Sequence, residues 1–171
     1  MKETAYIGDN VKLISKLKKI EQLKDFSDTD LRSFLQLAKL REYETGEIII
    51  QEGEIDCWIY FLINGKLEIT KKDKIITRLQ NPGDLFGEMG VISGSPRSAT
   101  VRAADTKTLV LGVDSSTVDR KLREKDHSLA HSVNRMFADI LANRLRRVTE
   151  DNIKLMNENL TLKEQLKSAK E

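Results

Sequence analysis

The chain has 171 residues and a net charge of +2, from 29 basic and 27 acidic side chains. This near balance argues against nonspecific nucleic-acid binding, and the length corresponds to one ordinary domain with an appendage. A lone cysteine, Cys57, excludes an intramolecular disulfide and a multi-thiolate metal site, and two histidines leave little for a hydrolytic triad. No apolar run approaches the ~20 residues of a membrane span, and the N-terminus lacks an apolar signal core. These observations favour a cytoplasmic, non-enzymatic protein outside the membrane.

The first segment, residues 1–40, has the periodicity of helices that pack on a core. From about residue 9, apolar side chains recur at steps of three, which predicts an amphipathic helix with the stripe Val11, Ile14, Leu17, Ile20, Leu23 and Phe26. Ser27 then has the position of a helix cap, with Asp30 at the third helical position as a partial capping box. A second helix is expected to bury Leu31, Phe34, Leu35 and Ala38.

The middle segment, residues 41–125, alternates short apolar runs with turn signals. The runs are rich in β-branched and aromatic residues and have strand length: Ile48–Ile50, Trp58–Ile63, Leu67–Ile69, Ile75–Ile76 and Thr108–Leu111. Asn64 and Gly65 lie between two runs and predict a β-hairpin, because both residues tolerate positive φ. Strands at this spacing are typical of a sandwich, a jelly roll or a β-roll. We therefore expect a mainly β core with flanking helices.

The last segment is predicted to be helical from about residue 118, with residues 126–171 forming a long C-terminal helix. It has no Gly or Pro, and from Leu141 it follows a heptad pattern. Asparagine at two a positions favours a parallel two-stranded coiled coil, and Glu158 and Lys163 have the spacing of an interchain ion pair. The alternative is a helix that packs on its own domain. The expected dimer interface comprises Leu141, Leu145, Val148, Asn152, Leu155, Asn159, Leu162 and Leu166.

The stretch from Asp84 to Val101 carries the most informative chemistry. Gly87 allows a close backbone approach, and residues 88–92 have the length of one helical turn, whose first amides suit an anion. Arg97 follows Glu88 on the same Gly-rich loop, and a guanidinium binds phosphate in bidentate fashion. This carboxylate and this guanidinium together suit a ligand with a sugar hydroxyl and a phosphate. The alternative is a surface turn with a Glu–Arg ion pair.

This stretch resembles the phosphate-binding cassette of the cyclic nucleotide-binding domain family. Phe86-Gly87-Glu88 and Pro96-Arg97-Ser98-Ala99-Thr100 both match the cassette at the right separation. The resemblance covers about residues 10–148. The family includes the effector domain of catabolite activator proteins, which this chain also resembles. It implies an antiparallel β-roll, jelly-roll-like, with N-terminal helices and a long C-terminal dimerisation helix. Further landmarks align in order, namely Glu44-x-Gly46-Glu47, Glu52-Gly53-Glu54, Tyr60, Asn64-Gly65 and Pro82-Gly83-Asp84.

The resemblance also implies a role for each matching residue. Glu88 would bind the ribose 2′-hydroxyl, and Arg97 would bind the exocyclic phosphate oxygens. Thr149 would reach the base from its own or the opposite subunit, or would be a solvated helix flank. The Arg-Ser pair, as in the catabolite activators, favours cAMP over cGMP as the regulatory ligand. The other ligand-binding residues would be Phe86, Gly87, Met89, Gly90, Ser98 and Ala99, with Val91 and Ile69 facing the sugar and base.

The expected function is a dimeric cyclic nucleotide sensor that signals through its C-terminal helix to an unidentified protein effector. Catabolite activators continue into a helix-turn-helix domain, whereas the residues after Thr149 carry heptads and balanced charge, so no DNA binding by this chain is expected. His127 and His131 lie at i, i+4 without a third ligand, so no metal is expected. Two alternatives stay open: the effector half of a transcription regulator, and a dimerising scaffold with an unoccupied cassette.

Overall fold

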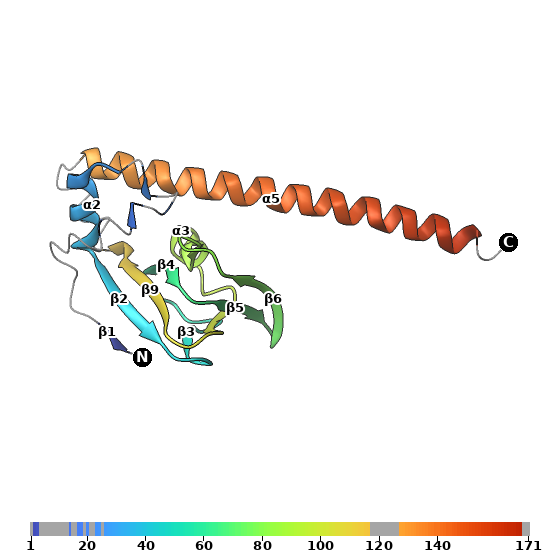
Figure 1. The fold of residues 1–171 in the computed structure, drawn as a ribbon, viewed down its shortest axis with the longest axis horizontal. Coiled ribbons are helices and arrows are strands. Elements are labelled where there is room, and N and C mark those ends of the chain that lie inside the picture. Colours follow the sequence, from blue (N-terminus) through green and yellow to red (C-terminus); the bar gives the residue numbers. More distant parts are fainter. Residues whose placement is uncertain are drawn as a thin grey trace. The chain divides into compact units, whose positions relative to one another are not determined.

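The computed structural model describes residues 2–3, 14, 17–18, 20, 23–24, 26–116 and 127–168. Within the last helix, side chains are described for residues 131–166. The chain divides into two compact units, Met1–Val133 and Asn134–Glu171 (Figure 1). Val11, the expected helical residues 118–126 and the side chain of His127 lie outside the described residues.

The first unit is built on two antiparallel sheets. One sheet has the strand order β1-β2-β9-β4-β7, and the other has the order β3-β8-β5-β6. All neighbouring strands pair antiparallel. This arrangement confirms the expected mainly antiparallel β fold. The strands are β1 (Lys2–Glu3), β2 (Ala38–Tyr43), β3 (Ile48–Ile50), β4 (Trp58–Asn64), β5 (Leu67–Lys71), β6 (Lys74–Leu79), β7 (Leu85–Phe86), β8 (Thr100–Ala103) and β9 (Thr108–Asp114).

The main hydrophobic cluster draws on both sheets. Successive side chains of a strand point to opposite faces, so β4 buries two sets of residues. Tyr60 and Leu62 belong to the cluster, whereas Phe61 packs edge-on against Phe34 at 6.0 Å between ring centroids. Burial on both faces explains why β4 is an unbroken apolar run in the sequence. The cluster comprises Tyr43, Ile50, Tyr60, Leu62, Leu67, Leu79, Phe86, Val101, Ala103 and Val110.

The N-terminal apolar stripe is buried where the structure describes it. Its described members are Ile14, Leu17, Ile20, Leu23 and Phe26. The N–H groups of Ile20, Leu23 and Phe26 each donate to the carbonyl three residues earlier. That spacing is the one of a 3₁₀ helix, and it places side chains three residues apart on the same face. The step of three in the sequence therefore corresponds to tight turns in this part of the segment.

The helix α2 (Asp28–Leu35) begins as the sequence predicts. The Ser27 hydroxyl accepts a hydrogen bond from the Asp30 N–H at 3.0 Å. The Asp30 carboxylate in turn accepts a hydrogen bond at 3.2 Å from the hydroxyl of Ser132, a residue far along the chain. The predicted buried stripe needs one correction. The helix ends at Leu35, and Ala38 is buried as the first residue of β2.

The predicted hairpin at Asn64 and Gly65 is wrong. The strand before these residues pairs within the first sheet, and the strand after them pairs within the second. They therefore form a crossover between sheets. Gly65 has a φ of +96°, and a Cβ there would lie 2.7 Å from Thr108 Oγ1. The glycine serves a close approach to β9.

The tight hairpin of the second sheet lies instead between β5 and β6. Lys71 pairs with Lys74 across two central residues, Lys72 and Asp73, whose φ values are 48° and 61°. Positive φ at both central positions is typical of a type I′ turn. The sequence analysis missed this turn because Lys-Asp lacks the Asn or Gly that usually marks it.

The helix α5 (His127–Ser168) is continuous, as the sequence predicts for this part of the chain. Apolar side chains at heptad positions are exposed within the single chain: Leu141, Leu145, Val148, Leu155, Leu162 and Leu166. Among the described residues, no helix has the length and apolar character that crossing a membrane requires.

Candidate functional site

A short helix, α3 (Glu88–Ser93), follows β7 directly and lies beside β4, and it covers the residues predicted to form a helical turn (Figure 1). Gly87 is its N-cap with a φ of 80°, and Gly94 is its C-cap with a φ of 61°. Only glycine adopts this left-handed conformation without a steric cost. The two glycines therefore define where the turn begins and ends.

Arg97 occupies the centre of the candidate site. Arg97 is buried, and its Nε donates to Asp56 Oδ2 at 3.0 Å. Its Nη2 donates to Asp56 Oδ1 and to the Trp58 carbonyl, and its Nη1 donates to the Gly87 carbonyl. Four of the five guanidinium N–H groups thus have acceptors within the protein. These contacts orient the guanidinium from two separate segments of the chain, at residues 56–58 and at Gly87.

The helix α3 packs closely against Arg97 because two of its positions are glycine. A Cβ at Gly87 would lie 3.1 Å from Arg97 Nη1 and 2.8 Å from Ile50 Cδ1. A Cβ at Gly90 would lie 3.4 Å from Arg97 Cδ and 3.0 Å from the Ser95 carbonyl oxygen. Larger residues at either position would push the turn away from the guanidinium.

Asp56 is a site residue that the sequence analysis missed. Its burial acts to raise the pKa of the carboxyl group, but the hydrogen bonds from Arg97 and from the Trp58 N–H outweigh burial and hold that pKa below its usual value. The Trp58 N–H donates to Asp56 Oδ1 at 2.7 Å, as in an Asx turn. An acidic residue just before a strand is the only local signal, and many turns in this chain carry one.

The predicted ligand-binding residues of this loop divide into buried and exposed groups. Glu88 is 2% exposed, so a carboxylate lies buried at the first position of α3. Phe86 is buried and stacks on Tyr60 at 5.2 Å between ring centroids. Met89 and Ser98 are exposed, and Gly90 and Ala99 are half-buried, as are Val91 and Ile69. The loop thus brings one buried carboxylate and one buried guanidinium to its two ends.

A second cluster, also missed from the sequence, lies beside the Arg97 contacts. The Arg41 guanidinium stands 4.1 Å from the centroid of the Trp58 ring, and its Nη1 donates to the Tyr60 hydroxyl at 2.9 Å. Glu3 accepts from Arg41 Nε and from Lys39 Nζ, each at 2.7 Å. Burial raises the pKa of Tyr60 to about 12, against the opposing influence of the Arg41 charge.

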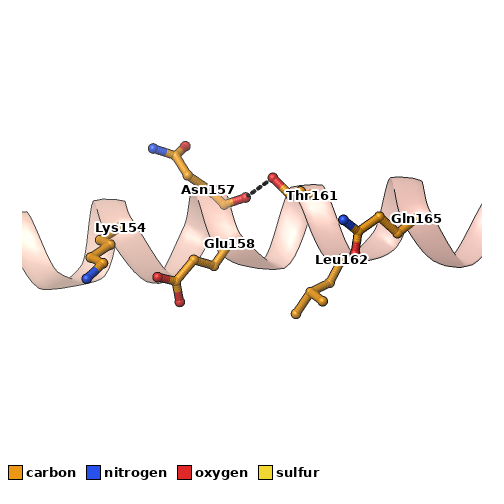
Figure 2. Close-up of a pocket in the computed structure, with 6 residues that line it drawn as sticks. All are labelled: Lys154, Asn157, Glu158, Thr161, Leu162 and Gln165. Atoms are coloured by element: carbon orange, nitrogen blue, oxygen red, sulfur yellow. Dashed lines mark hydrogen bonds between the residues drawn. The ribbon is translucent and has the colours of Figure 1, made fainter.

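The predicted site residue Thr149 belongs to the second unit. Its hydroxyl donates to the Leu145 carbonyl at 2.8 Å, a bond within its own helix. Figure 2 shows a pocket farther along α5, where the Thr161 hydroxyl donates to the Asn157 carbonyl at 3.1 Å. All of the described residues that line this pocket lie on one face of the single helix α5. Its lining residues are Lys154, Asn157, Glu158, Thr161, Leu162 and Gln165.

Metal ligands do not gather in the described part of the chain. There, no group of three or more His, Cys, Asp and Glu side chains has an arrangement that could hold a metal ion. Cys57 is exposed and has no disulfide partner.

Comparison with known sequences gives a family and several curated relatives. The sequence model of the cyclic nucleotide-binding domain matches residues 40–125. A cAMP-dependent protein kinase regulatory subunit of Debaryomyces hansenii is 31% identical over 90 residues, which cover 53% of this chain and 20% of the relative. The cGMP-dependent protein kinase 2 of Homo sapiens is 28% identical over 110 residues, which cover 61% of this chain and 14% of the relative. This chain therefore spans a fifth or less of the length of either relative.

Solved structures share the fold. A cyclic nucleotide-binding domain from Methylobacillus flagellatus superposes with a TM-score of 0.70 at 21% identity, over 85% of this chain and 84% of the other. The catabolite activator protein of Thermus thermophilus superposes with a TM-score of 0.60 at 24% identity, over 78% of this chain and 62% of the other. With half of its residues matched by the family's sequence model and its β-roll matched by these structures, the chain belongs to the cyclic nucleotide-binding domain family.

Proposed function

We propose that the chain is a regulatory sensor that binds a cyclic nucleotide in its β-roll and has no catalytic activity of its own. The observation that carries this proposal is the buried guanidinium of Arg97, held beside a glycine-capped turn whose first residue is the buried Glu88. Arg97 would bind the exocyclic phosphate oxygens, and Glu88 would accept a hydrogen bond from the ribose 2′-hydroxyl. A guanidinium and a carboxylate on one loop suit a ligand that has both a phosphate and a ribose hydroxyl.

The proposed ligand is cAMP, with cGMP as the alternative. The residue after Arg97 is Ser98, and the Arg-Ser pair is shared with catabolite activators. Relatives of this chain include both cAMP-dependent and cGMP-dependent kinase proteins, so the choice between adenine and guanine is left to the binding experiment. The exposed hydroxyl of Ser98 is available to a ligand from solvent.

We assign one task to each part of the chain. Residues 1–40 would support the roll, residues 41–125 would bind the nucleotide, and residues 126–171 would form a parallel coiled coil between two copies. Ligand binding would change the equilibrium position of α5, and Thr149 would contact the base. An effector protein in the cytoplasm would respond to that change. A ligand shifts such an equilibrium only by its difference in affinity between the two states.

Thermal unfolding with cAMP, cGMP and 5′-AMP tests the proposal. Ligand at about 100 times its dissociation constant adds about 2.7 kcal/mol to the native state, which is a shift of several degrees in a domain of this size. The variant Arg97→Lys keeps the charge opposite Asp56 but lacks the bidentate edge, and it should lose most of this shift. The matched control is Arg102→Lys on the exposed side of β8, which should keep the shift.

The outcomes separate the proposal from its rivals. A shift with a cyclic nucleotide, absent with 5′-AMP and lost in Arg97→Lys, supports the sensor and identifies the base. The internal acceptors already bound to Arg97 favour one rival, a dimerising scaffold whose loop takes no ligand. An unchanged melting temperature with every nucleotide would support that scaffold. Salt-sensitive duplex binding by a longer parent protein would favour the effector half of a transcription regulator.

A further inference from the structure

The hydrogen bonds of Arg97 determine what a bound phosphate must displace. Asp56 takes the edge formed by Nε and one Nη2 hydrogen. The second Nη2 hydrogen belongs to the outer edge of the guanidinium, between Nη2 and Nη1, and it donates to the Trp58 carbonyl. A phosphate that accepts two parallel bonds from this outer edge therefore takes the place of the Trp58 carbonyl.

Gly112 and Arg41 both lie close to the Trp58 ring. Its ring lies over Gly112, where an added Cβ would be 3.2 Å from Trp58 Cε3. The Arg41 guanidinium lies 4.1 Å from the ring centroid, a cation–π contact. A backbone shift at Trp58 would therefore change the contact between its ring and Arg41.

Arg41 is tied to the beginning of the chain. Glu3 accepts one hydrogen bond from Arg41 and one from Lys39, and these bonds hold the two-residue strand β1 on the edge of β2. Two residues of strand pairing are a weak attachment without those side chains. A Trp58 ring that moves against Arg41 would therefore disturb the contact between Glu3 and Arg41, together with the Arg41 bond to the Tyr60 hydroxyl.

We propose that phosphate binding at Arg97 is coupled to release of the N-terminal strand through Trp58, Arg41 and Glu3. The bound phosphate replaces the Trp58 carbonyl, and the ring displaces Arg41. Glu3 then keeps only its bond from Lys39, which weakens the attachment of β1. This inference rests on the proposed function, since the phosphate belongs to the bound cyclic nucleotide. Coupling between two events is reciprocal, so loss of the Glu3 contact must strengthen nucleotide binding by the same factor that binding weakens the contact.

The test uses Glu3→Gln in the full chain, with Glu68→Gln as the matched control. The Glu3 and Glu68 side chains are each 29% exposed, and Glu68 accepts two hydrogen bonds from Arg78 on the other sheet. We expect Glu3→Gln to bind cAMP at least about five-fold more tightly, the lower end of typical coupling between sites. Glu68→Gln should bind as the wild type does.

Trp58 is the only tryptophan of the chain, so its fluorescence is a second, ligand-free readout. Without ligand, Glu3→Gln should shift the emission in the same direction as cAMP shifts the wild type. If the wild type binds cAMP but Glu3→Gln shows unchanged or weaker binding, the coupling is wrong and the proposed function stands. An equal change in Glu68→Gln would also overturn the coupling. If the wild type binds no cyclic nucleotide, the proposed function fails and this inference fails with it.

Discussion

Arg97 and Asp56 form the charge pair on which the candidate site depends. The Arg97 side chain is 3% exposed and that of Asp56 is 32% exposed, so the pair lies at the margin of the interior. If the carboxylate is removed, the buried guanidinium still has its desolvation penalty but no longer has the attraction of an opposite charge to offset it. The pair therefore orients the Arg97 guanidinium and also contributes to the stability of the fold.

The first prediction concerns Asp56→Asn. The folded-state pKa of Asp56 is lowered, so its contribution to stability is present above its unfolded pKa and is lost as the pH falls through the folded pKa. We expect Asp56→Asn to lower the free energy of unfolding by about 1–3 kcal/mol at neutral pH. The difference from the wild type should shrink below about pH 4.

Urea unfolding as a function of pH measures this difference. Glu68→Gln is the control, because an exposed ion pair contributes only about 0–1 kcal/mol. pH 3 and pH 7 lie roughly one unit below and three units above the ordinary pKa of an aspartate in an unfolded chain. A constant difference between them would contradict the assignment to the Asp56 charge.

The second prediction compares two glycines of similar conformation. Gly87 and Gly53 have φ values of +80° and +86°, but only a Cβ at Gly87 meets other atoms, and a Cβ at Gly53 has nothing within 4 Å. Gly53→Ala should cost about 1–2 kcal/mol of stability, from the left-handed backbone alone. Gly87→Ala should cost more and should also weaken cyclic nucleotide binding. Equal losses of stability in urea unfolding would show that the close contact at Gly87 adds nothing to the free energy of unfolding.

At the scale of elements, α5 differs from the strands that form the hydrophobic cluster of the β-roll. The strands bury apolar residues within the first unit, whereas α5 exposes its heptad leucines within the single chain. Helical stability in water comes mainly from packing of an apolar face, and a helix of 42 residues with an exposed apolar seam favours a helical partner. In a coiled coil, asparagines at a positions lower stability but select a two-stranded pairing.

The third prediction therefore concerns Asn152→Leu/Asn159→Leu. Leucine at both a positions should raise the melting temperature of the helix and admit species larger than a dimer. Asn157→Leu is the matched control, since residue 157 lies on the outer side of the heptad. Light scattering after size exclusion measures the mass. A monomeric wild type, or an unchanged mass and melting temperature in the double variant, would argue against the coiled coil.

At the scale of the whole molecule, the chain combines two units with different sources of stability. The unit Met1–Val133 holds the hydrophobic cluster and the candidate site. The stability of the unit Asn134–Glu171 would come from a second chain, so it would depend on protein concentration. A protein built in this way need not unfold in one step.

The fourth prediction is that two probes report two transitions. Trp58 fluorescence follows the β-roll, and circular dichroism at the helical band follows mainly α5. The dichroism midpoint should rise with protein concentration, and the fluorescence midpoint should rise with cAMP. Coincident midpoints under all conditions would show that the chain unfolds as one cooperative unit.

Local chemistry in the sequence was enough to predict many features of this chain. The Ser27 cap, the turn at Glu88, the strand-length apolar runs and the long helix were predicted because each depends on neighbours a few residues away. The choice of Glu88 and Arg97 as site residues came from a motif confined to one loop. Features of this kind depend on short stretches of chain. The structure has the Ser27 cap, the turn α3 and the long helix α5 where these stretches predict them.

Other features required the tertiary structure, because they join residues distant in sequence. Asn64 and Gly65 have the local pattern of a hairpin, but pairing with other strands places their flanking segments in different sheets. Asp56 meets Arg97 across 41 positions, and Glu3 meets Arg41 across 38. The sequence by itself therefore determined the helix α2, the long helix α5, the turn at Glu88, the motif and five strands, β3, β4, β5, β6 and β9. It did not predict β1, β2, β7 and β8. Only the folded chain decided which strands pair and which charges compensate Arg97, since both depend on contacts between segments that local propensity does not encode.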